Sequence, residues 1–474
     1  MVFSSIFFIF CFLPPFLLLY YLVPEKFRNI LLFIGSLIFY AWGDPIYVVL
    51  MLFSSFFNYY MALEIDHLDK DPKGRKKNLI FAVTINLLIL GFFKYWGFLL
   101  DTFSTITGIS IAHPQLALPI GISFYTFKNL SYILDVSKKK VSPQRKFLTY
   151  AVYSTMFPHM SAGPIVRYAD IEGQLTRRSI SLTRLGLGAE YFTKGLAKKV
   201  LLADNLSAIY TSILSSGSNS VLTAWIGILA YTLQLYFDFS GYSDMAIGLG
   251  KMMGFDFLKN FDYPYISTSV SEFWRRWHIS LGSWFRDYIY IPLGGNRVSV
   301  PKHIRNIFVV WALTGLWHGA SWTFVVWGLW HGLFLLIEEY VPGLKKLPKF
   351  FGHLYTMLVV TLGFVLFRAD TFSYALGYFG AMFFGFDFSS AHMALFFEQL
   401  TPWFLVMFVV AIIGCAPIRP LAEKVKEMIF NPSGLSLPWK IVSVALYVLA
   451  FIGLVWCIVR LSSGGYHPFI YFRF

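Results

Sequence analysis

Long apolar runs, separated by short loops rich in lysine and arginine, leave this chain few ways to fold. Several of the runs approach the ~20 residues that a helix needs to cross the hydrocarbon core of a bilayer. Only 14% of the 474 residues are charged and 57% are apolar, whereas about a quarter of the residues of a soluble protein are charged. The sequence therefore predicts an all-α polytopic membrane protein.

The basic loops predict how the chain is oriented. The first apolar run, 3–23, lacks the basic start and the small-residue cleavage site of a signal peptide, so we expect a retained transmembrane helix. Lysine and arginine collect in the cytoplasmic loops of membrane proteins. The loops at 24–29 and 69–78 are both basic and are expected in the cytoplasm, which places the N-terminus outside.

Further crossings follow from the same alternation. They are 30–42, 46–63, 79–100, 116–134 (broken near Pro119 and Gly121), 306–340 (bent at glycines), 351–367, 398–418 and 438–461. In total about eleven transmembrane helices are expected, on the criterion of length and apolarity. Neither a repeat nor a linker is visible, so we expect a single membrane domain over 1–474.

Two central regions, 150–199 and 251–305, mix apolar stretches with proline, glycine and many basic residues. They are too polar to cross a membrane simply and too apolar to form a soluble domain. Irregular backbone is tolerated at membrane depth only where protein buries it or where it lines a cavity. We therefore expect re-entrant and interfacial helices around a central cavity with a vestibule facing the cytoplasm.

The formal charge of +14 does not predict a nucleic-acid partner, because the basic residues lie in short loops between apolar spans. Cys11, Cys415 and Cys457 lie in apolar runs without the spacing of a disulfide pair or a metal site, so we interpret them as inert. No metal site is predicted. The chain also lacks the P-loop, dinucleotide-binding, CxxC, HExxH and GxSxG motifs.

The segment 271–288, S-E-F-W-R-R-W-H-I-S-L-G-S-W-F-R-D-Y, carries aromatic residues at helical spacing. On one helix, a single face would hold Trp274, Trp277, His278, Leu281, Phe285 and Tyr288. We expect an amphipathic helix at the membrane interface. His278 would face protein, either as a core histidine or as a functional group.

The motif L-W-H-G occurs twice, ending at Gly319 and Gly332, and brings His318 and His331 into an apolar, tryptophan-rich stretch. An ionisable residue inside a membrane segment is by default a candidate functional residue. Burial keeps an imidazole neutral, and a neutral imidazole can act as a general base. On an unbroken helix the two histidines would point about 220° apart. We therefore favour His318 as the functional residue and His331 as a structural one.

Two carboxylates, Asp238 and Asp244, stand in an apolar run, where Ser240 and Asp244 share a helix face. They either line a substrate site or form a hydrogen-bonded patch between helices. The sequence G-G-N-R at 294–297 predicts a turn, and its Arg297 could bind a phosphate.

Several long motifs occur in an order that resembles the membrane-bound O-acyltransferase (MBOAT) family. They are M-V-F-S-S, D-F-S-G-Y-S-D-M-A-I-G-L-G-K-M-M-G-F, F-W-R-R-W-H-I-S-L-G-S-W-F-R-D-Y-I-Y-I-P-L-G-G-N-R, L-T-G-L-W-H-G-A-S-W and P-F-I-Y-F-R-F. The similarity extends over nearly the whole chain. It is greatest to the bacterial alginate O-acetyltransferase branch, with its peptidoglycan and cellulose O-acetylation relatives.

This resemblance implies a ring of helices around a central tunnel, with His318 as the catalytic residue and His278 as a second histidine across a cytoplasmic funnel. It implies acetyl-CoA as the acyl donor, with no permanently bound cofactor. The expected partner is an extracytoplasmic SGNH-type acetyltransferase, at a bacterial cytoplasmic (inner) membrane. A relative that transfers D-alanine to teichoic acid takes its acyl group from a carrier protein, and acetyl is favoured here because the 233–297 blocks are closer to the alginate branch.

The remaining substrate-binding residues are predicted from chemistry. Arg275, Arg276, Arg286 and Arg297 could bind the phosphates of acetyl-CoA. Trp274, Trp277, Asp238 and Asp244 are expected to line the substrate site. The oxyanion of acyl transfer needs a hydrogen-bond donor, which His278, a tryptophan indole such as that of Trp317, or Ser321 could supply. Two other functions stay open: a transporter of an acyl carrier or lipid-linked sugar, although no inverted repeat is visible, and a scaffold for an outer acetylation complex.

Overall fold

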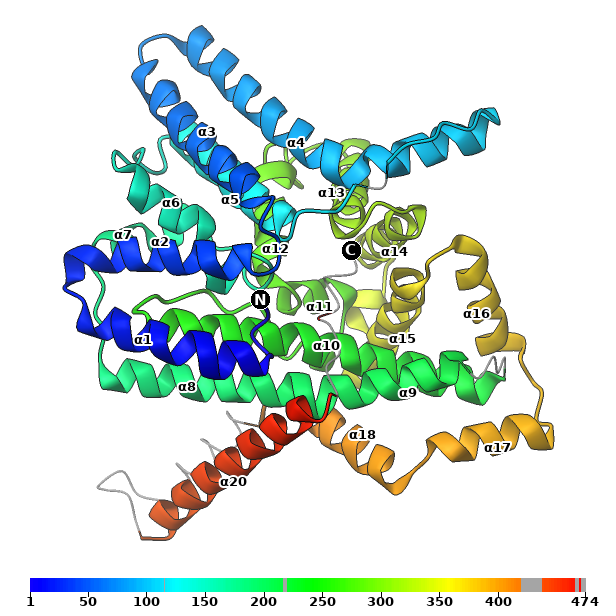
Figure 1. The fold of residues 1–474 in the computed structure, drawn as a ribbon. Coiled ribbons are helices and arrows are strands. Elements are labelled where there is room, and N and C mark those ends of the chain that lie inside the picture. The colour runs from blue at the N-terminus through cyan, green and yellow to red at the C-terminus, as the bar shows by residue number, and fades with distance from the viewer. Residues whose placement is uncertain (115, 216–219, 419–436, 465–468, 470–474) are drawn as a thin grey trace.

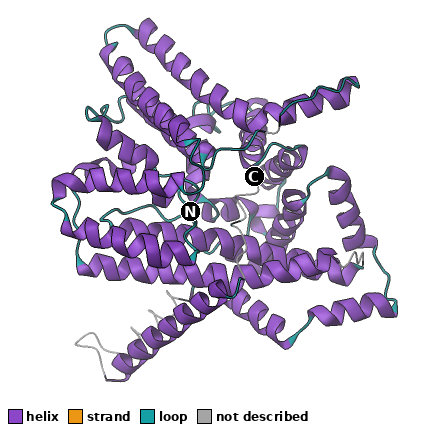
Figure 2. Ribbon diagram, viewed as in Figure 1, coloured by secondary structure: helices purple, strands orange, loops and turns teal. Residues whose placement is uncertain are grey.

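The computed structural model describes residues 1–114, 116–215, 220–418, 437–464 and 469, and these residues form helices and loops without a strand (Figures 1 and 2). The helices surround a centre that contains short helices and the N-terminus (Figure 1). The predicted all-α membrane fold is confirmed.

The first half of the chain is a series of helices joined mostly by short loops. The elements are η1 (Phe7–Phe12), α1 (Leu13–Leu22), α2 (Glu25–Ala41), α3 (Val48–His67), α4 (Pro72–Thr107), α5 (Ile122–Ser137), α6 (Phe147–Thr155), η2 (Phe157–His159), α7 (Tyr168–Thr176), α8 (Leu182–Ala197), η3 (Lys198–Ala203) and α9 (Asp204–Ser215). Of these, η1 and η3 are π-helical and η2 is a 3-10 turn.

The second half begins with a long central helix and continues through short segments. The elements are α10 (Val221–Met252), η4 (Pro264–Ile266), α11 (Val270–Arg276), α12 (Ile279–Phe285), η5 (Arg286–Tyr290), α13 (Val300–His318), α14 (Trp322–Tyr340), η6 (Leu344–Lys346), α15 (Lys349–Arg368), α16 (Phe372–Phe384), α17 (Ser390–Gln399), α18 (Pro402–Gly414) and α20 (Leu437–Ser462). The break before α5 falls where Pro119 and Gly121 predict it.

Four helices, α3, α4, α10 and α15, are long and apolar enough to cross a membrane by length and composition. Together, α17 and α18 would form a fifth span, although they meet at 61°. Several apolar spans in one chain agree with a multi-pass membrane protein. The other predicted crossings do not meet this criterion among the described residues, so the total of about eleven stays a prediction.

Helix α10 lies against α8 at pairs of glycines with matching spacing. A side chain at Gly188 would meet the backbone of Gly248, and one at Gly195 would meet the backbone of Gly241. Each pair is seven residues apart on its helix, which is two turns. Small residues that let helix backbones approach closely are typical of contacts between membrane helices.

The predicted bent span 306–340 is wrong in one respect, because the structure has two helices there instead of one. After α13 the chain is extended at Gly319, and α14 begins behind the N-cap residue Ser321. The two helices touch backbone to backbone, since a side chain at Gly315 would meet Phe324 and one at Gly328 would meet the carbonyl of Trp311.

The predicted amphipathic helix over 271–288 is also wrong, because the structure divides it into α11, α12 and η5. The break is at His278, which has φ 44° and ψ 53°, in the left-handed region that residues other than glycine seldom adopt. The aromatic face expected from a single helix is therefore split between two directions.

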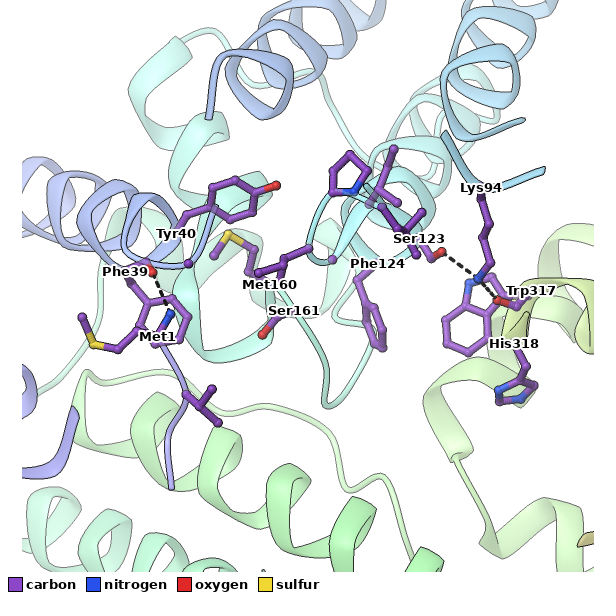
Figure 3. Close-up of a pocket in the computed structure, with 17 residues that line it drawn as sticks. Met1, Phe39, Tyr40, Lys94, Ser123, Phe124, Met160, Ser161, Trp317 and His318 are labelled. Carbon is purple, nitrogen blue, oxygen red and sulfur yellow. Dashed lines mark hydrogen bonds between the residues drawn. The ribbon is translucent and has the colours of Figure 1, made fainter. Parts of the chain in front are cut away.

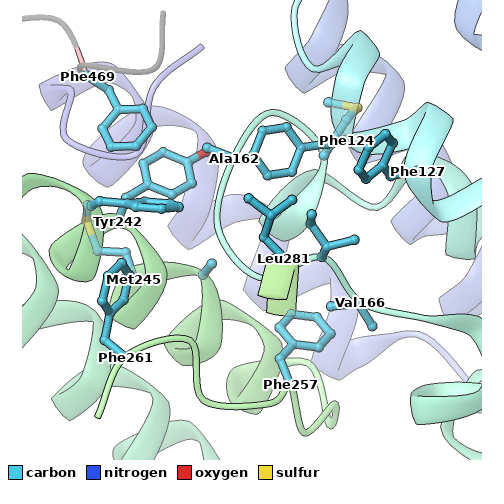
Figure 4. Close-up of a cluster of buried hydrophobic side chains, with 14 of the residues drawn as sticks. Phe124, Phe127, Ala162, Val166, Tyr242, Met245, Phe257, Phe261, Leu281 and Phe469 are labelled. Atoms are coloured by element: carbon cyan, nitrogen blue, oxygen red, sulfur yellow. The ribbon is translucent and has the colours of Figure 1, made fainter. Parts of the chain in front are cut away.

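Buried aromatic side chains hold the two ends of the described chain against α10. The ring of Tyr242 stacks on that of Phe3, with centres 4.7 Å apart, and on that of Phe469, with centres 4.6 Å apart. Figure 4 shows Tyr242 and Phe469 together in a cluster that extends to Phe124. This core connects α10 to the segments that carry the candidate site.

Candidate active site

His318 is the last residue of α13, and the local sequence explains why the helix ends there. Gly319 follows in an extended conformation, and the Ser321 hydroxyl accepts a hydrogen bond from the Thr323 amide at 3.3 Å to begin α14. The turn between two closely packed helices therefore fixes His318 at the tip of the hairpin.

Aromatic rings surround the imidazole of His318. Ring centres lie 5.0 Å away at Trp317, 4.9 Å at Trp327 and 5.2 Å at Phe367, all near perpendicular. The side chain is 3% exposed. These rings shield the imidazole from water on the sides that they cover.

A cavity of about 420 Å³ reaches His318 (Figure 3). Its wall is built from the N-terminus, the turn after α2, the segment before α5 and the end of α13. The lining includes Met1, Gly43, Lys94, Leu118, Ile120, Gly121, Ser123, Met160, Ser161, Trp317 and His318. A volume of this size is within the range of sites for small molecules.

Lys94 brings an amino group into this cavity, whose other polar groups include Ser123, Ser161 and His318. Its ammonium donates a hydrogen bond to the carbonyl oxygen of Trp317 and another, of 3.3 Å, to the Ser123 hydroxyl (Figure 3). Lys94 lies within the apolar run 79–100 and was not predicted as a site residue. A charged residue inside an apolar span was the signal that could have found it.

His278 is held in its left-handed conformation by Asn260. The Asn260 side-chain oxygen lies 3.2 Å from Nδ1 of His278 and accepts hydrogen bonds from the amide and the hydroxyl of Ser280. A side-chain amide oxygen can only accept hydrogen bonds, so Nδ1 of His278 must carry the proton. Nε2 of His278 is therefore the basic nitrogen. Asn260 was not predicted as a site residue, because no motif or charge pattern in the neighbouring sequence marks it.

The two predicted catalytic histidines are brought together around Trp317. The ring centre of Trp317 lies 5.8 Å from that of His278 and 5.0 Å from that of His318. Residues forty positions apart therefore lie close together around Trp317, and of the two histidines His318 lines the cavity.

His331 lies behind this site instead of in it. It is fully buried in α14 against the rings of Trp274, Trp311 and Trp327, and it does not line the cavity. Trp274 thus contacts His331. Trp277 is buried against Phe261, Tyr265 and Phe364, and neither tryptophan lines the cavity.

Asp238 and Asp244 are both placed in ion pairs away from the cavity. Lys199 lies 2.8 Å from Asp238 and 2.9 Å from Asp204, and Lys198 lies 2.8 Å from Asp244. The π-helical segment η3 aims both lysines at α10. Of the two interpretations left open by the sequence, this geometry favours the polar patch between helices.

The four predicted phosphate-binding arginines differ in their surroundings. Arg276 pairs with Glu272 at 2.9 Å, and Arg286 pairs with Asp287 at 2.7 Å. Arg275, Arg286 and Arg297 are exposed. Of the predicted oxyanion donors, Trp317 lines the cavity with His318, whereas the Ser321 hydroxyl bonds to Thr323 at the start of α14. Within the described ranges no group of three or more His, Cys, Asp or Glu residues could hold a metal ion.

Comparison with known proteins extends this picture beyond the site. The matching family is described as MBOAT, membrane-bound O-acyltransferase family, over residues 128–381. The chain is 40% identical over 491 residues to a probable alginate O-acetylase of Pseudomonas putida, covering all of both chains. It is 45% identical over 390 residues to one of Pseudomonas aeruginosa, covering 81% of this chain and 75% of that protein.

A relative with another substrate is the peptidoglycan O-acetyltransferase of Helicobacter pylori. It is 36% identical over 414 residues, covering 79% of this chain and 78% of that protein. The family match includes both candidate histidines, and the full-length similarity covers the cavity as well. The chain therefore belongs to the membrane-bound O-acyltransferase family and is a multi-pass membrane O-acyltransferase.

Proposed function

We propose that this protein transfers an acetyl group from cytoplasmic acetyl-CoA to an acceptor on the outer face of a bacterial cytoplasmic membrane, for O-acetylation of a polysaccharide. The names of the relatives, alginate O-acetylase and peptidoglycan O-acetyltransferase, support an acetyl group and a polysaccharide. The observation that carries the proposal is His318 on the wall of a cavity remote from the basic loops.

The connections that line the cavity support its outward orientation. Met1, Gly43 and the segment 118–123 contribute to the wall. The basic loops 24–29 and 69–78 are at the opposite ends of α2 and α4. Because basic loops remain in the cytoplasm, the cavity and the N-terminus would face the outside.

The depth of His318 supports transfer across the membrane. Helix α13 begins at a basic end, with Lys302 and Arg305 in its first turns. His318 is about 27 Å further along at 1.5 Å per residue, close to the ~30 Å thickness of a hydrocarbon core. A donor from the cytoplasm and an acceptor from the cavity would therefore meet at the tip of the hairpin.

Direct transfer through His318 accounts for the chemistry. The imidazole takes the proton of the acceptor hydroxyl, and the oxygen forms a bond to the thioester carbonyl carbon. The tetrahedral intermediate then collapses, the carbon–sulfur bond breaks, and the imidazolium returns the proton to the leaving thiolate. The Trp317 indole is our candidate for the oxyanion donor, because Nε2 of His278 carries no proton while Nδ1 donates to Asn260. The exposed Arg275 and Arg297 are our first candidates for the phosphates of the donor.

The acceptor we propose is a hydroxyl of an extracytoplasmic SGNH-type partner protein, which then esterifies the polymer. Mass spectrometry of O-acetyl groups on the wall and secreted polymers of a deletion strain identifies the polymer. Loss of acetyl groups from one polymer is the expected result. An unchanged acetyl content in every polymer would contradict the proposal.

Inverted membrane vesicles test donor and direction together. Vesicles from the deletion strain, complemented with wild-type protein or His318→Ala, receive acetyl-CoA labelled in the acetyl group at the exposed cytoplasmic face. We expect alkali-labile label on luminal protein or polymer with wild-type protein only. Luminal label that stays in intact acetyl-CoA would indicate a transporter, and equal labelling with His318→Ala would exclude the catalytic role.

A further inference from the structure

Two consecutive residues of α4 contact two consecutive carbonyls at the end of α13. The Lys94 ammonium donates to the carbonyl oxygen of Trp317, and the Tyr95 hydroxyl donates to that of Leu316 at 2.6 Å. These are the two residues that immediately precede His318. The contacts join segments more than two hundred residues apart in the chain.

The end of α13 needs donors at this point. The last four carbonyls of an α-helix have no partner inside the helix. Here the Gly319 amide reaches the carbonyl of Gly315 at 3.3 Å, and the chain then becomes extended. A cation is also favourable at the C-terminus of a helix, because the helix dipole is negative there.

Lys94 is located at a depth where a lysine is costly. It is about 22 Å beyond Leu79, the first apolar residue after the basic loop, at 1.5 Å per residue. Lys94 would therefore lie past the middle of a ~30 Å hydrocarbon core, but still inside it. Ionisable residues inside the core cost free energy and usually have a function. The Ser123 hydroxyl at 3.3 Å and the Trp317 ring, 5.9 Å from the ammonium, complete its surroundings.

We propose that Lys94 and Tyr95 are positioning residues for His318, and this inference rests on the proposed function. They bind the carbonyls of Trp317 and Leu316 and thereby fix the last turn of α13 against α4. The imidazole then keeps a fixed position between the donor and the cavity. Phe124 supports the same turn, since its ring meets that of Trp317 edge-on at 5.4 Å.

The variants Lys94→Met and Tyr95→Phe remove one donor each at nearly constant shape. Because a misplacement of about 1 Å can lower a rate by about 10²-fold, we expect kcat for acetyl transfer to fall at least tenfold in Lys94→Met and severalfold in Tyr95→Phe. KM for acetyl-CoA should change less than twofold, since the cytoplasmic site is intact. The matched control is Tyr59→Phe, which removes a 2.9 Å bond from a tyrosine to the carbonyl of Arg145 and should leave kcat unchanged.

A second measurement separates positioning from stability. Solid-state NMR of protein labelled with ¹⁵N-histidine should show that the His318 signals, assigned by their loss in His318→Ala, shift or broaden in Lys94→Met while the His331 signals stay. If both variants keep wild-type kcat and His318 signals, the inference is wrong even though wild-type protein transfers acetyl. If wild-type protein transfers no acetyl from acetyl-CoA, the proposed function itself has failed.

Discussion

His318 and His331 lie on different helices, yet the indole of Trp327 contacts both imidazoles, with ring centres 4.9 Å and 5.2 Å away. The repeated motif L-W-H-G therefore builds two successive layers of one aromatic wall. The first layer ends α13 and meets the cavity. The second is inside α14 and packs against α15, where a side chain at Gly363 would meet His331.

The contact between α13 and α14 predicts a stability defect. In Gly328→Ala, the added methyl group would meet the carbonyl of Trp311. We expect a cost of about 1–3 kcal/mol, because overpacking forces the two backbones apart. The thermal unfolding temperature in detergent measures this effect. Gly380→Ala is the control, because its surroundings are open among the described residues. An equal unfolding temperature for both variants would contradict the close packing.

The ion pairs around Lys199 predict a structural role for Asp238. Lys199→Met would leave the buried carboxylates of Asp204 and Asp238 without their cation. Removing one partner of a buried pair costs about 3–5 kcal/mol. We expect a much lower unfolding temperature, while the remaining folded protein keeps its KM for acetyl-CoA.

The comparison variant for this experiment is Lys139→Met, at the exposed pair with Asp69. It should hardly change the unfolding temperature, because surface ion pairs contribute little. If Asp238→Asn instead raised KM with unchanged stability, Asp238 would belong to the substrate site after all.

Narrowing the cavity should reduce acetylation of the acceptor and leave the binding of acetyl-CoA unchanged. Ile120→Trp adds a large ring to the lining. We expect strongly reduced acetylation of the outer acceptor with an unchanged KM for acetyl-CoA, measured in inverted vesicles. Ile46→Trp, at a highly exposed residue just after the turn at Gly43, serves as its counterpart and should be neutral. A raised KM for acetyl-CoA in Ile120→Trp would mean that the cavity admits the donor.

The arginines should contribute unequally to donor binding. Arg276 and Arg286 already pair with carboxylates, whereas Arg275 and Arg297 are exposed, as Arg286 is, but make no ion pair with a described residue. We expect Arg275→Gln and Arg297→Gln to raise KM for acetyl-CoA severalfold at low salt and less at high salt, because screening weakens exposed charge interactions. An effect confined to Arg276→Gln and Arg286→Gln would reverse this assignment.

The sequence predicts the class of fold and the central histidines because both depend on local signals. Apolar runs identify membrane helices, and the repeated W-H-G motif marks His318 and His331, of which the family resemblance selects His318. The break at His278 was not predictable from periodicity, since Asn260, eighteen residues earlier, stabilises its left-handed backbone. Periodicity assumes a continuous helix and cannot register a distant side chain that stabilises a break.

The same reason explains the other differences. Asp238 and Asp244 carry a functional signal in the sequence, but their lysines approach from η3, a separate element. Lys94 lies in the site but is not part of any motif in the sequence. A single lysine in a long apolar run gains its meaning only from the contact with α13. Tertiary contacts decide which intramembrane charges face the site.

The most direct test compares the two copies of the motif in one assay. His318→Gln and His331→Gln each replace an imidazole by an uncharged polar group, and both are assayed for acetyl transfer per folded protein, with folding followed by the unfolding temperature. We expect His318→Gln to lose about 10²–10⁴-fold in kcat, the contribution of a general base, and His331→Gln to keep kcat near wild type with a lower unfolding temperature. Wild-type transfer by folded His318→Gln, or a kcat loss confined to His331→Gln, would contradict His318 as the catalytic base.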